Sequence, residues 1–245
     1  MVVEYDGTDY HGFAIQARLR TVQGELEGAV ARVTGVKTRV VGSGRTDAGA
    51  HALAQVVSFK TESRLPPLDL RRALNANLPP DLVVKGVEEV EEGFHARRSA
   101  RCRHYRYSLW NAELPSVFSR RYRFHVPEPL DLEAMNRAAG VLVGTRDFAC
   151  FTYGVARFLA AGRCRTTVRT LFSAQWHGVP PEVEFDVVGT AFLPHMIRNM
   201  VGSMLRVGQR KLTPEEYREL VERSDLQLST AKVPAHGLML LAVEY

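Results

Sequence analysis

The stretch Gly42-Ser-Gly-Arg-Thr-Asp-Ala-Gly-Ala-His-Ala52 decides how the rest of this chain is interpreted. It places three glycines, an arginine, an aspartate and a histidine between two β-type runs, 38–41 and 53–59. A plain turn between strands needs only a few residues with one or two special backbone positions. Three glycines permit positive φ and let the backbone fold tightly around a small polar object. The stretch therefore indicates an elaborate loop between two strands.

Two charged residues make this loop a candidate for chemistry. Arg45 and Asp47 lie two residues apart, and a turn at 46–49 would point the Asp47 carboxylate outward into a cleft. The alternative is that Asp47 only closes an Asx-turn while Arg45 is solvated. The loop taken alone leaves both interpretations open.

Length and composition exclude several protein classes. The 245 residues are 45% hydrophobic and 24% charged, which is typical of a globular chain with one large or two small cores. No apolar run approaches the roughly 20 residues that span a bilayer, and the first residues resemble neither a signal nor a transit peptide. The first predicted strand starts abruptly at Met1, which leaves room for a start codon upstream.

Cysteine and histidine spacing argues against a disulfide framework or a metal site. The three cysteines are widely spaced without a CxxC pair, and the eight histidines show no HxxxH or HExxH spacing. The chain also lacks a P-loop and a dinucleotide fingerprint. We therefore expect a cytoplasmic protein with no metal, no cofactor and no membrane partner.

The charge indicates a polyanionic partner. The net charge is +5, and only five of the 32 basic residues are lysine. Arginine suits nucleic acid because its planar fork grips phosphate and stacks on bases, although a genome biased towards arginine would give the same composition. The segments 95–107 and 119–125 interleave arginines with aromatic residues, the pattern of an RNA-binding surface.

Apolar periodicity predicts two halves in which strands alternate with amphipathic helices. Strands are expected at 2–5, 38–41, 53–59, 82–90, 103–110, 182–188 and 237–245. Helices are expected at 22–34 with Thr21 as cap, 68–78 with Asp69 as cap, 130–142, 194–207, and after the capping box at 213–216. The pattern predicts an α+β fold of two subdomains, 1–102 and 103–245, whose sheets join with a cleft between them.

Arg198 is the second candidate site residue. It lies near the start of the otherwise apolar helix 194–207, at the end where the helix dipole disfavours a cation. The arginine must either extend to solvent along its apolar stem or meet an anion. A pair between Asp47 and Arg198 across the cleft would explain both residues together.

Motifs spread over nearly the whole chain resemble those of the TruA family of tRNA pseudouridine synthases. They are Glu4-Tyr-Asp-Gly7, Thr21-Val-Gln23, Gly44-Arg-Thr-Asp-Ala-Gly-Ala-His51, Asn75-Ala-Asn-Leu-Pro79, Phe94-His-Ala-Arg97, Tyr105-Arg-Tyr107, His195-Met-Ile-Arg-Asn-Met-Val-Gly202 and Gly237-Leu-Met-Leu240. The resemblance implies two ferredoxin-like α+β subdomains sharing a central, mostly antiparallel sheet with helices on one side. It also implies a homodimer that isomerises uridines 38, 39 and 40 in the tRNA anticodon stem-loop.

The same resemblance implies roles for individual residues. Asp47 matches the essential aspartate, Tyr105 the tyrosine that stacks on the target base, and Arg198 the arginine that pairs with the aspartate. Arg45 matches the arginine that helps to hold the flipped nucleotide, and 237–240 the stretch that adds an apolar wall to the pocket. The chain departs from the family pattern at Phe13, at Pro194 and in the long apolar segment 151–170.

The chemistry of pseudouridine formation would explain why residues of these types are needed. The reaction breaks the N1–C1′ bond, rotates the base and joins C5 to C1′, so it needs an ionised carboxylate and a closed pocket but no cofactor. Asp47 would be nucleophile or base, kept charged by Arg198, while Tyr105 stacks on the flipped base. Two other classes stay open: an RNA-binding module without activity, and a cofactor-free hydrolase with Asp6 as its second acid or base.

Overall fold

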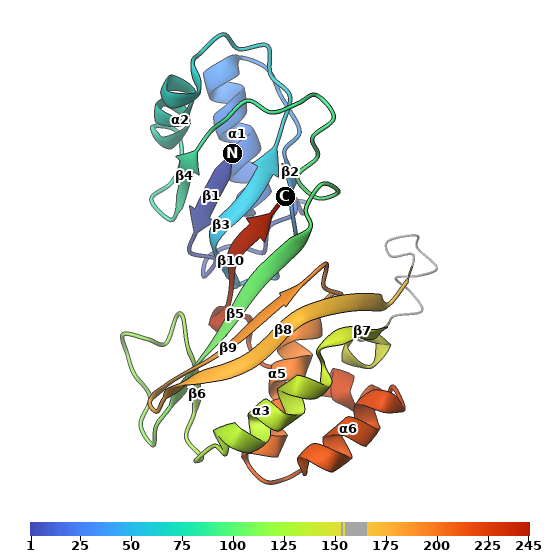
Figure 1. The fold of residues 1–245 in the computed structure, drawn as a ribbon. Helices are drawn as coiled ribbons and strands as arrows, with labels where there is room; N and C mark the ends of the chain where they lie inside the picture. The colour runs from blue at the N-terminus through green and yellow to red at the C-terminus, as the bar shows by residue number, and fades with distance from the viewer. Residues whose placement is uncertain (153, 155–165) are drawn as a thin grey trace. The chain divides into compact units, whose positions relative to one another are not determined.

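The computed structural model describes residues 1–152, 154 and 166–245. Backbone contacts divide the chain into two compact units, residues 1–103 with 239–245, and residues 104–238 (Figure 1). Among the described residues, ten strands form a mixed, mostly antiparallel sheet. The predicted α+β class is confirmed.

The first unit is built from strands that alternate with two helices. Its elements are β1 (Val2–Tyr5), α1 (Val22–Thr34), β2 (Val41–Gly42), β3 (His51–Ser58), α2 (Pro67–Asn75), β4 (Leu82–Gly86) and the last strand of the chain, β10 (Leu238–Glu244). The strand order is β4-β1-β3-β10, with β1 antiparallel to both β3 and β4. Helices α1 and α2 contact each other (Figure 1).

The second unit combines an antiparallel meander with a group of helices. Its strands are β5 (Cys102–Asn111), β6 (Phe124–Val126), β7 (Gly144–Asp147), β8 (Val168–Val179) and β9 (Glu182–Gly189), ordered β5-β9-β8-β7. Its helices are α3 (Leu132–Val141), α5 (Met196–Gly208) and α6 (Pro214–Glu222), with short 3₁₀ turns at Ala149–Phe151, Leu226–Thr230 and Ala235–Gly237. Figure 1 shows α3, α5 and α6 grouped along one side of β8 and β9.

Local capping chemistry places the helix ends where the sequence predicts them. The Thr21 side chain accepts a hydrogen bond from Gly24 N, and α1 ends at Gly35 with φ of 73°. Thr213 and Glu216 form the predicted capping box at the start of α6. No helix in the described part of the chain is long and apolar enough to cross a membrane.

Some elements differ from the predictions. Helix α2 begins at Pro67 after Pro66, which makes no side-chain cap, while the predicted cap Asp69 lies in the first turn, 3.4 Å from Arg72. The strand expected at 38–41 is reduced to Val41–Gly42, because side chains of α1 hold the backbone before it. Strands β7 and β8 were not predicted, since most residues of β8 are exposed or half-buried and show no clear alternation. Much of the departing segment 151–170 lies outside the described residues.

The last strand lies with the first unit, whereas the sequence assigned all of 103–245 to the second subdomain. Its residues Met239 and Leu240 pair in parallel with His51 and Ala52 of β3. Pairing between the chain's end and β3 is non-local, so no pattern within the strand itself reveals it. The division into subdomains after residue 102 stays a prediction.

Candidate functional site

The loop between β2 and β3 is anchored at several points in the first unit. Tyr5 Oη and Thr46 Oγ1 are 2.8 Å apart, and Phe13 N donates to Thr46 O at 3.1 Å. The fully buried Gln55 side chain of β3 donates from Nε2 to Gly44 O at 2.9 Å. The loop is therefore held by side chains from two strands and by a backbone group of the segment that follows β1. The sequence did not single out Gln55 as a residue that supports the loop, although a polar glutamine inside the apolar run 53–59 indicates a buried hydrogen bond.

Asp47 lies at the start of a tight turn within this anchored loop. Its carbonyl accepts a hydrogen bond from Ala50 N at 3.1 Å, and Gly49 has φ of 81°. The turn therefore spans 47–50, one residue later than expected, and needs glycine at its third position. The Asp47 side chain is half-buried between the buried Thr46 and the exposed Ala48, while Arg45 is exposed. Backbone groups and the neighbouring Thr46 side chain hold the loop at both sides of Asp47.

Glycines of the N-terminal segment let it lie directly against the loop. A Cβ atom at Gly7 would lie 1.9 Å from Ala50 O. Gly12, with φ of 90°, would place a Cβ atom 2.8 Å from Thr46 O. Both contacts are far below van der Waals distance, so only glycine fits at these positions. Phe13, which departs from the family pattern, is 3% exposed and belongs to the core of this unit.

Two polar residues of α1 position the chain that enters the loop. Gln23 Nε2 donates to Val40 O at 3.1 Å, and Val40 N donates to Glu27 Oε1 at 3.0 Å. The two side chains are also joined to each other at 2.8 Å. Side chains thus satisfy both backbone groups of Val40, in place of a strand ladder. Gln23 belongs to the Thr-Val-Gln motif, to which the sequence analysis gave no role.

Arg198 occupies an anchored position in the second unit. It is half-buried in the first turn of α5, and its Nε donates to Val233 O at 2.7 Å. The following residue, Pro234, accepts a hydrogen bond from Tyr107 Oη at 2.7 Å, and a Cβ atom at Gly237 would lie 2.7 Å from the Tyr107 ring. Burial raises the pKa of Tyr107, against the opposing effect of the Arg198 charge. The segment 233–237 is therefore held by both β5 and α5, and Arg198 is not a side chain that merely extends to solvent.

Tyr105 lies on the buried face of β5, as the alternation predicts. Its side chain is 7% exposed, and its ring meets Phe192 edge-on with centroids 5.2 Å apart. Arg103 on the same face is also buried and donates to Ser43 O at 2.9 Å and Arg97 O at 2.8 Å. Arg103 therefore holds the start of the loop and is not available to grip phosphate.

The structure places the four predicted site residues two in each unit. Asp47 and Arg45 lie in the first unit, on the loop before β3, while Tyr105 and Arg198 lie in the second, on β5 and α5. The pair between Asp47 and Arg198, and the roles of all four residues, stay predictions.

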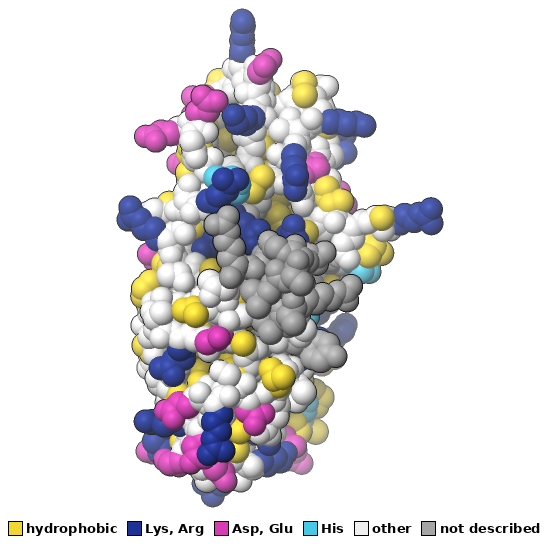
Figure 2. Space-filling view, turned by 90° about the vertical axis from the view of Figure 1, so that its right-hand side faces the viewer, with side chains coloured by type: hydrophobic (Ala, Val, Ile, Leu, Met, Phe, Trp, Pro, Cys, Tyr) yellow, Lys and Arg dark blue, Asp and Glu magenta, His cyan; other side chains and the backbone are white. Residues whose placement is uncertain are grey.

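The two basic segments are only partly a free cationic surface. Arg106 Nε lies 2.7 Å from Asp186, and Arg123 lies 3.2 Å from both Glu182 and Glu184. Burial alone would raise the pKa of Asp186, but the hydrogen bonds from Arg106 lower it. Arg106 and Arg123 therefore form ion pairs with β9. This corrects the expectation that all arginines of the two segments face RNA. The arginines that remain exposed are Arg97, Arg98, Arg101, Arg120 and Arg121. Figure 2 shows cationic side chains spread over one face without a single patch.

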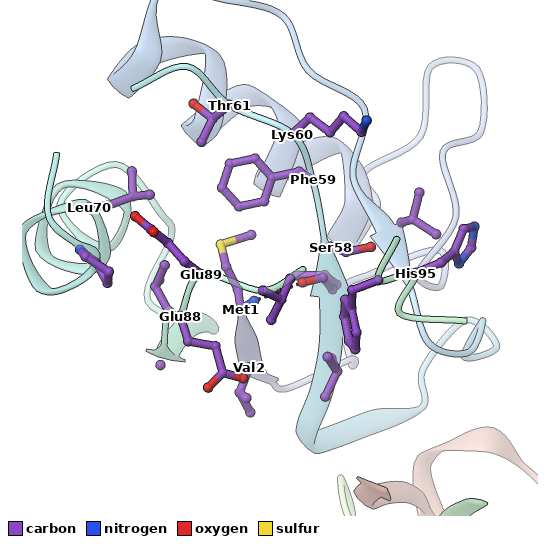
Figure 3. Close-up of a pocket in the computed structure, with 18 of the residues that line it drawn as sticks. Met1, Val2, Ser58, Phe59, Lys60, Thr61, Leu70, Glu88, Glu89 and His95 are labelled. Atoms are coloured by element: carbon purple, nitrogen blue, oxygen red, sulfur yellow. Dashed lines mark hydrogen bonds between the residues drawn. The ribbon is translucent and has the colours of Figure 1, made fainter. Parts of the chain in front are cut away.

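A cavity of about 730 Å³ lies elsewhere in the first unit (Figure 3). Met1, Phe59 and Leu70 give it apolar walls, and Glu88, Glu89, Glu91 and Glu92 line it as well. Arg39 and Lys60 line the cavity too, with Lys60 3.2 Å from Glu92, but the four carboxylates outnumber these cations and disfavour a polyanion. None of the predicted site residues lines this cavity.

Other reactive groups in the described residues have structural explanations. Asp6, the second acid of the hydrolase alternative, accepts hydrogen bonds at Oδ1 from Thr8 N at 3.0 Å and Thr8 Oγ1 at 2.6 Å. Cys102 and Cys150 are buried, and burial raises the pKa of the Cys150 thiol to about 12. No group of three or more metal-ligating side chains occurs in the described part of the chain.

We expect Gly202→Ala to destabilise the protein strongly. A Cβ atom at Gly202 would lie 1.5 Å from Ala231 O, which is backbone and cannot rotate away. Overpacking of this kind costs about 3 kcal/mol, and it would displace the segment that holds Arg198. The matched control is Gly140→Ala in α3, where no atom lies within 4 Å of the added Cβ. There alanine should raise the free energy of unfolding by about 0.5–1 kcal/mol. Thermal unfolding of both variants measures the difference, and equal melting temperatures would contradict the close contact at Gly202.

Comparison with known proteins agrees with the motif series. A family model described as tRNA pseudouridine synthase matches residues 1–97 and 138–245. A tRNA pseudouridine synthase A of Brevibacillus brevis is 42% identical over 244 residues, covering 100% of this chain and 98% of the relative. Proteins with the same description from Geobacillus kaustophilus and Acetivibrio thermocellus are 42% and 38% identical over 245 residues; both alignments cover 100% of this chain, with 93% and 98% of the relatives. Because both kinds of match extend over most of the sequence, the chain belongs to the tRNA pseudouridine synthase family of isomerases.

Proposed function

We propose that this protein converts uridine to pseudouridine at positions 38, 39 and 40 of the tRNA anticodon stem-loop, with Asp47 as the catalytic carboxylate. The observation that carries the proposal is the anchored loop of the first unit. Hydrogen bonds to Thr46 and Gly44 fix the backbone on the amino side of Asp47, and the 47–50 turn fixes it on the other side. A rigid loop that presents a half-buried carboxylate suits a group that must meet one ribose or base atom.

The reaction conserves all atoms of the nucleoside. The N1–C1′ bond breaks, the uracil rotates, and a C5–C1′ bond forms; the proton on C5 leaves and N1 gains one, so no redox partner is needed. Asp47 acts as nucleophile or as base in this sequence. We assign to Arg198 the counter-charge that keeps the carboxylate ionised and oriented. Its bond to Val233 O supports the assignment, because it holds the guanidinium in one place.

Arg45 and Tyr105 contact the flipped nucleotide in this proposal. The exposed Arg45, two residues before Asp47, is free to reach a phosphate or a displaced base. The Tyr105 ring, positioned edge-on by Phe192, stacks on the target uracil. We further propose that the protein is a homodimer, with tRNA shared between two subunits. Light scattering should then give twice the chain mass of 27.4 kDa.

Incubation with an unmodified tRNA transcript separates the proposed activity from the two alternatives. A synthase leaves carbodiimide-reactive pseudouridine in the RNA, which stops reverse transcriptase one nucleotide before positions 38–40. A hydrolase that cuts the glycosidic bond would instead release free uracil and leave an abasic site. A binding module would change nothing. Stops at other uridines only would overturn the assignment to the anticodon stem-loop.

We expect Tyr105→Phe to bind tRNA more tightly than Tyr105→Leu. Stacking of a base on an aromatic ring contributes roughly 1–3 kcal/mol and needs the ring, not the hydroxyl group. The phenylalanine variant should also keep the edge-on contact with Phe192. The hydroxyl can still serve in removing the C5 proton, so turnover of this variant can fall while binding persists. Filter binding with both variants measures the difference, and equal affinities would argue against stacking.

A further inference from the structure

A second groove in the first unit adjoins the loop that carries Asp47. Its volume is about 610 Å³, within the ~300–1,000 Å³ range of ligand-sized pockets. One face of α1 and the segments 14–15 and 37–39 line it, together with Arg45. Arg45 is two residues from Asp47, so the groove borders the same loop that carries the proposed catalytic carboxylate.

The charges in this groove favour an anion. Lys37, Arg39 and Arg45 are all exposed, and none forms an ion pair with any residue that the structure describes. Several other cations of the protein are neutralised by contrast: Arg20 lies 2.8 Å from Asp81 in the same unit. Three like charges around one groove repel each other, so their unpaired clustering is explained best by a ligand that supplies negative charge.

The single carboxylate among the described lining residues does not cancel these cations. Glu27 accepts hydrogen bonds at Oε1 from Val40 N at 3.0 Å and from Gln23 Nε2 at 2.8 Å. Those contacts bind it to the groove wall, where it positions the backbone that leads into the loop. The cationic side chains are left to face solvent.

The rest of the groove is apolar and suits a ribose or the face of a base. Ala14, Ile15, Gly28 and Ala31 line it, and the Ile15 side chain is 51% exposed. An exposed isoleucine beside unpaired cations matches the two surfaces of a single-stranded nucleotide, one apolar and one anionic. The cavity in Figure 3 shares Arg39 with this groove, but four glutamates line it as well.

We propose that this groove binds the sugar–phosphate backbone of the nucleotides next to the target uridine, with Lys37 and Arg39 on the phosphates. The inference rests on the proposed function, since it takes the substrate to be an RNA loop with a uridine at Asp47. It adds a binding site beside the catalytic residues, which shares Arg45 with the loop that carries Asp47. The groove fixes which part of the RNA lies beside the loop.

The test compares two double variants that remove the same charge. Lys37→Ser with Arg39→Ser alters the groove, whereas Lys60→Ser with Arg64→Ser removes two exposed cations outside it. Affinity for an unmodified anticodon stem-loop RNA is measured by filter binding between 50 and 200 mM salt. Single-stranded RNA contributes about 0.7 to the salt slope per phosphate contact, so the groove variant should lose about 1.4 from its slope. Its dissociation constant should rise about tenfold at 100 mM salt, and the control should match the wild type.

Neutral methylphosphonate linkages placed one at a time in the same RNA identify the phosphates. We expect one or two linkages beside the target uridine to weaken binding to the wild type but not to the groove variant. Equal slopes for the two double variants, or a uniform response along the stem, would overturn the inference. Because binding is measured without turnover, a wild type that binds this RNA but forms no pseudouridine would instead contradict the proposed function.

Discussion

Asp47→Asn should abolish pseudouridine formation, with a fall in turnover on the order of 10⁴-fold or more. The amide keeps the shape of the side chain but can be neither nucleophile nor base at neutral pH. The fold should persist, because Thr46, Gly44 and the 47–50 turn hold the loop through groups other than the carboxylate. Release of tritium from C5 of labelled uridine in tRNA measures the reaction, and filter binding shows whether substrate affinity is retained.

Two carboxylates in the segment that follows β1 serve as controls for this variant. Asp9 is exposed in the same unit, and Asp9→Asn should leave the rate unchanged. Asp6→Asn removes the negative charge but keeps an oxygen that can accept from Thr8, so it tests the hydrolase alternative, which needs Asp6 as an acid or base. Turnover of Asp47→Asn at the wild-type rate would contradict the role of Asp47. Loss of the native fold in this variant would show that the carboxylate is structural.

Arg198→Met should lower kcat/KM by about 10²–10³-fold, or about 3–4 kcal/mol of transition-state stabilisation. Methionine preserves the apolar stem that packs in α5 but removes the charge that we assign to Asp47. The same change removes the hydrogen bond from Nε to Val233 O, and bonds from charged donors contribute about 1.5–3 kcal/mol to stability. A moderate decrease in melting temperature should therefore accompany the loss of activity.

A matched control separates these two effects in the same helix. Arg206 is half-buried in the last turn of α5, and Arg206→Met should leave the rate close to that of the wild type. Measuring Arg198→Met well below its melting temperature ensures that the folded protein is assayed. Full activity of Arg198→Met under those conditions would contradict the proposed pair with Asp47, whatever its stability.

The sequence alone determined the elements whose cause is local. Thr21 and Gly35 delimit α1 through a side-chain cap and a left-handed terminal residue, and the alternation along β5 predicted the buried face that carries Tyr105. The glycine-rich loop with Asp47 was recognisable because glycine permits backbone conformations that other residues resist. Each of these inferences needs only neighbours within a few positions of the chain.

The tertiary structure alone decided which polar residues support the loop and which cations remain free. Gln55 and Gln23 reach backbone groups 11 and 17 positions away, and Arg106 meets Asp186 80 positions further along the chain. The same holds for β10, which joins β3 although residues 59–237 lie between them. Such partners depend on how distant segments pack. The sequence therefore cannot distinguish a paired basic or polar residue from an exposed one. For the same reason, the sequence could not show that Lys37, Arg39 and Arg45 line one groove while Arg106 and Arg123 form ion pairs with β9.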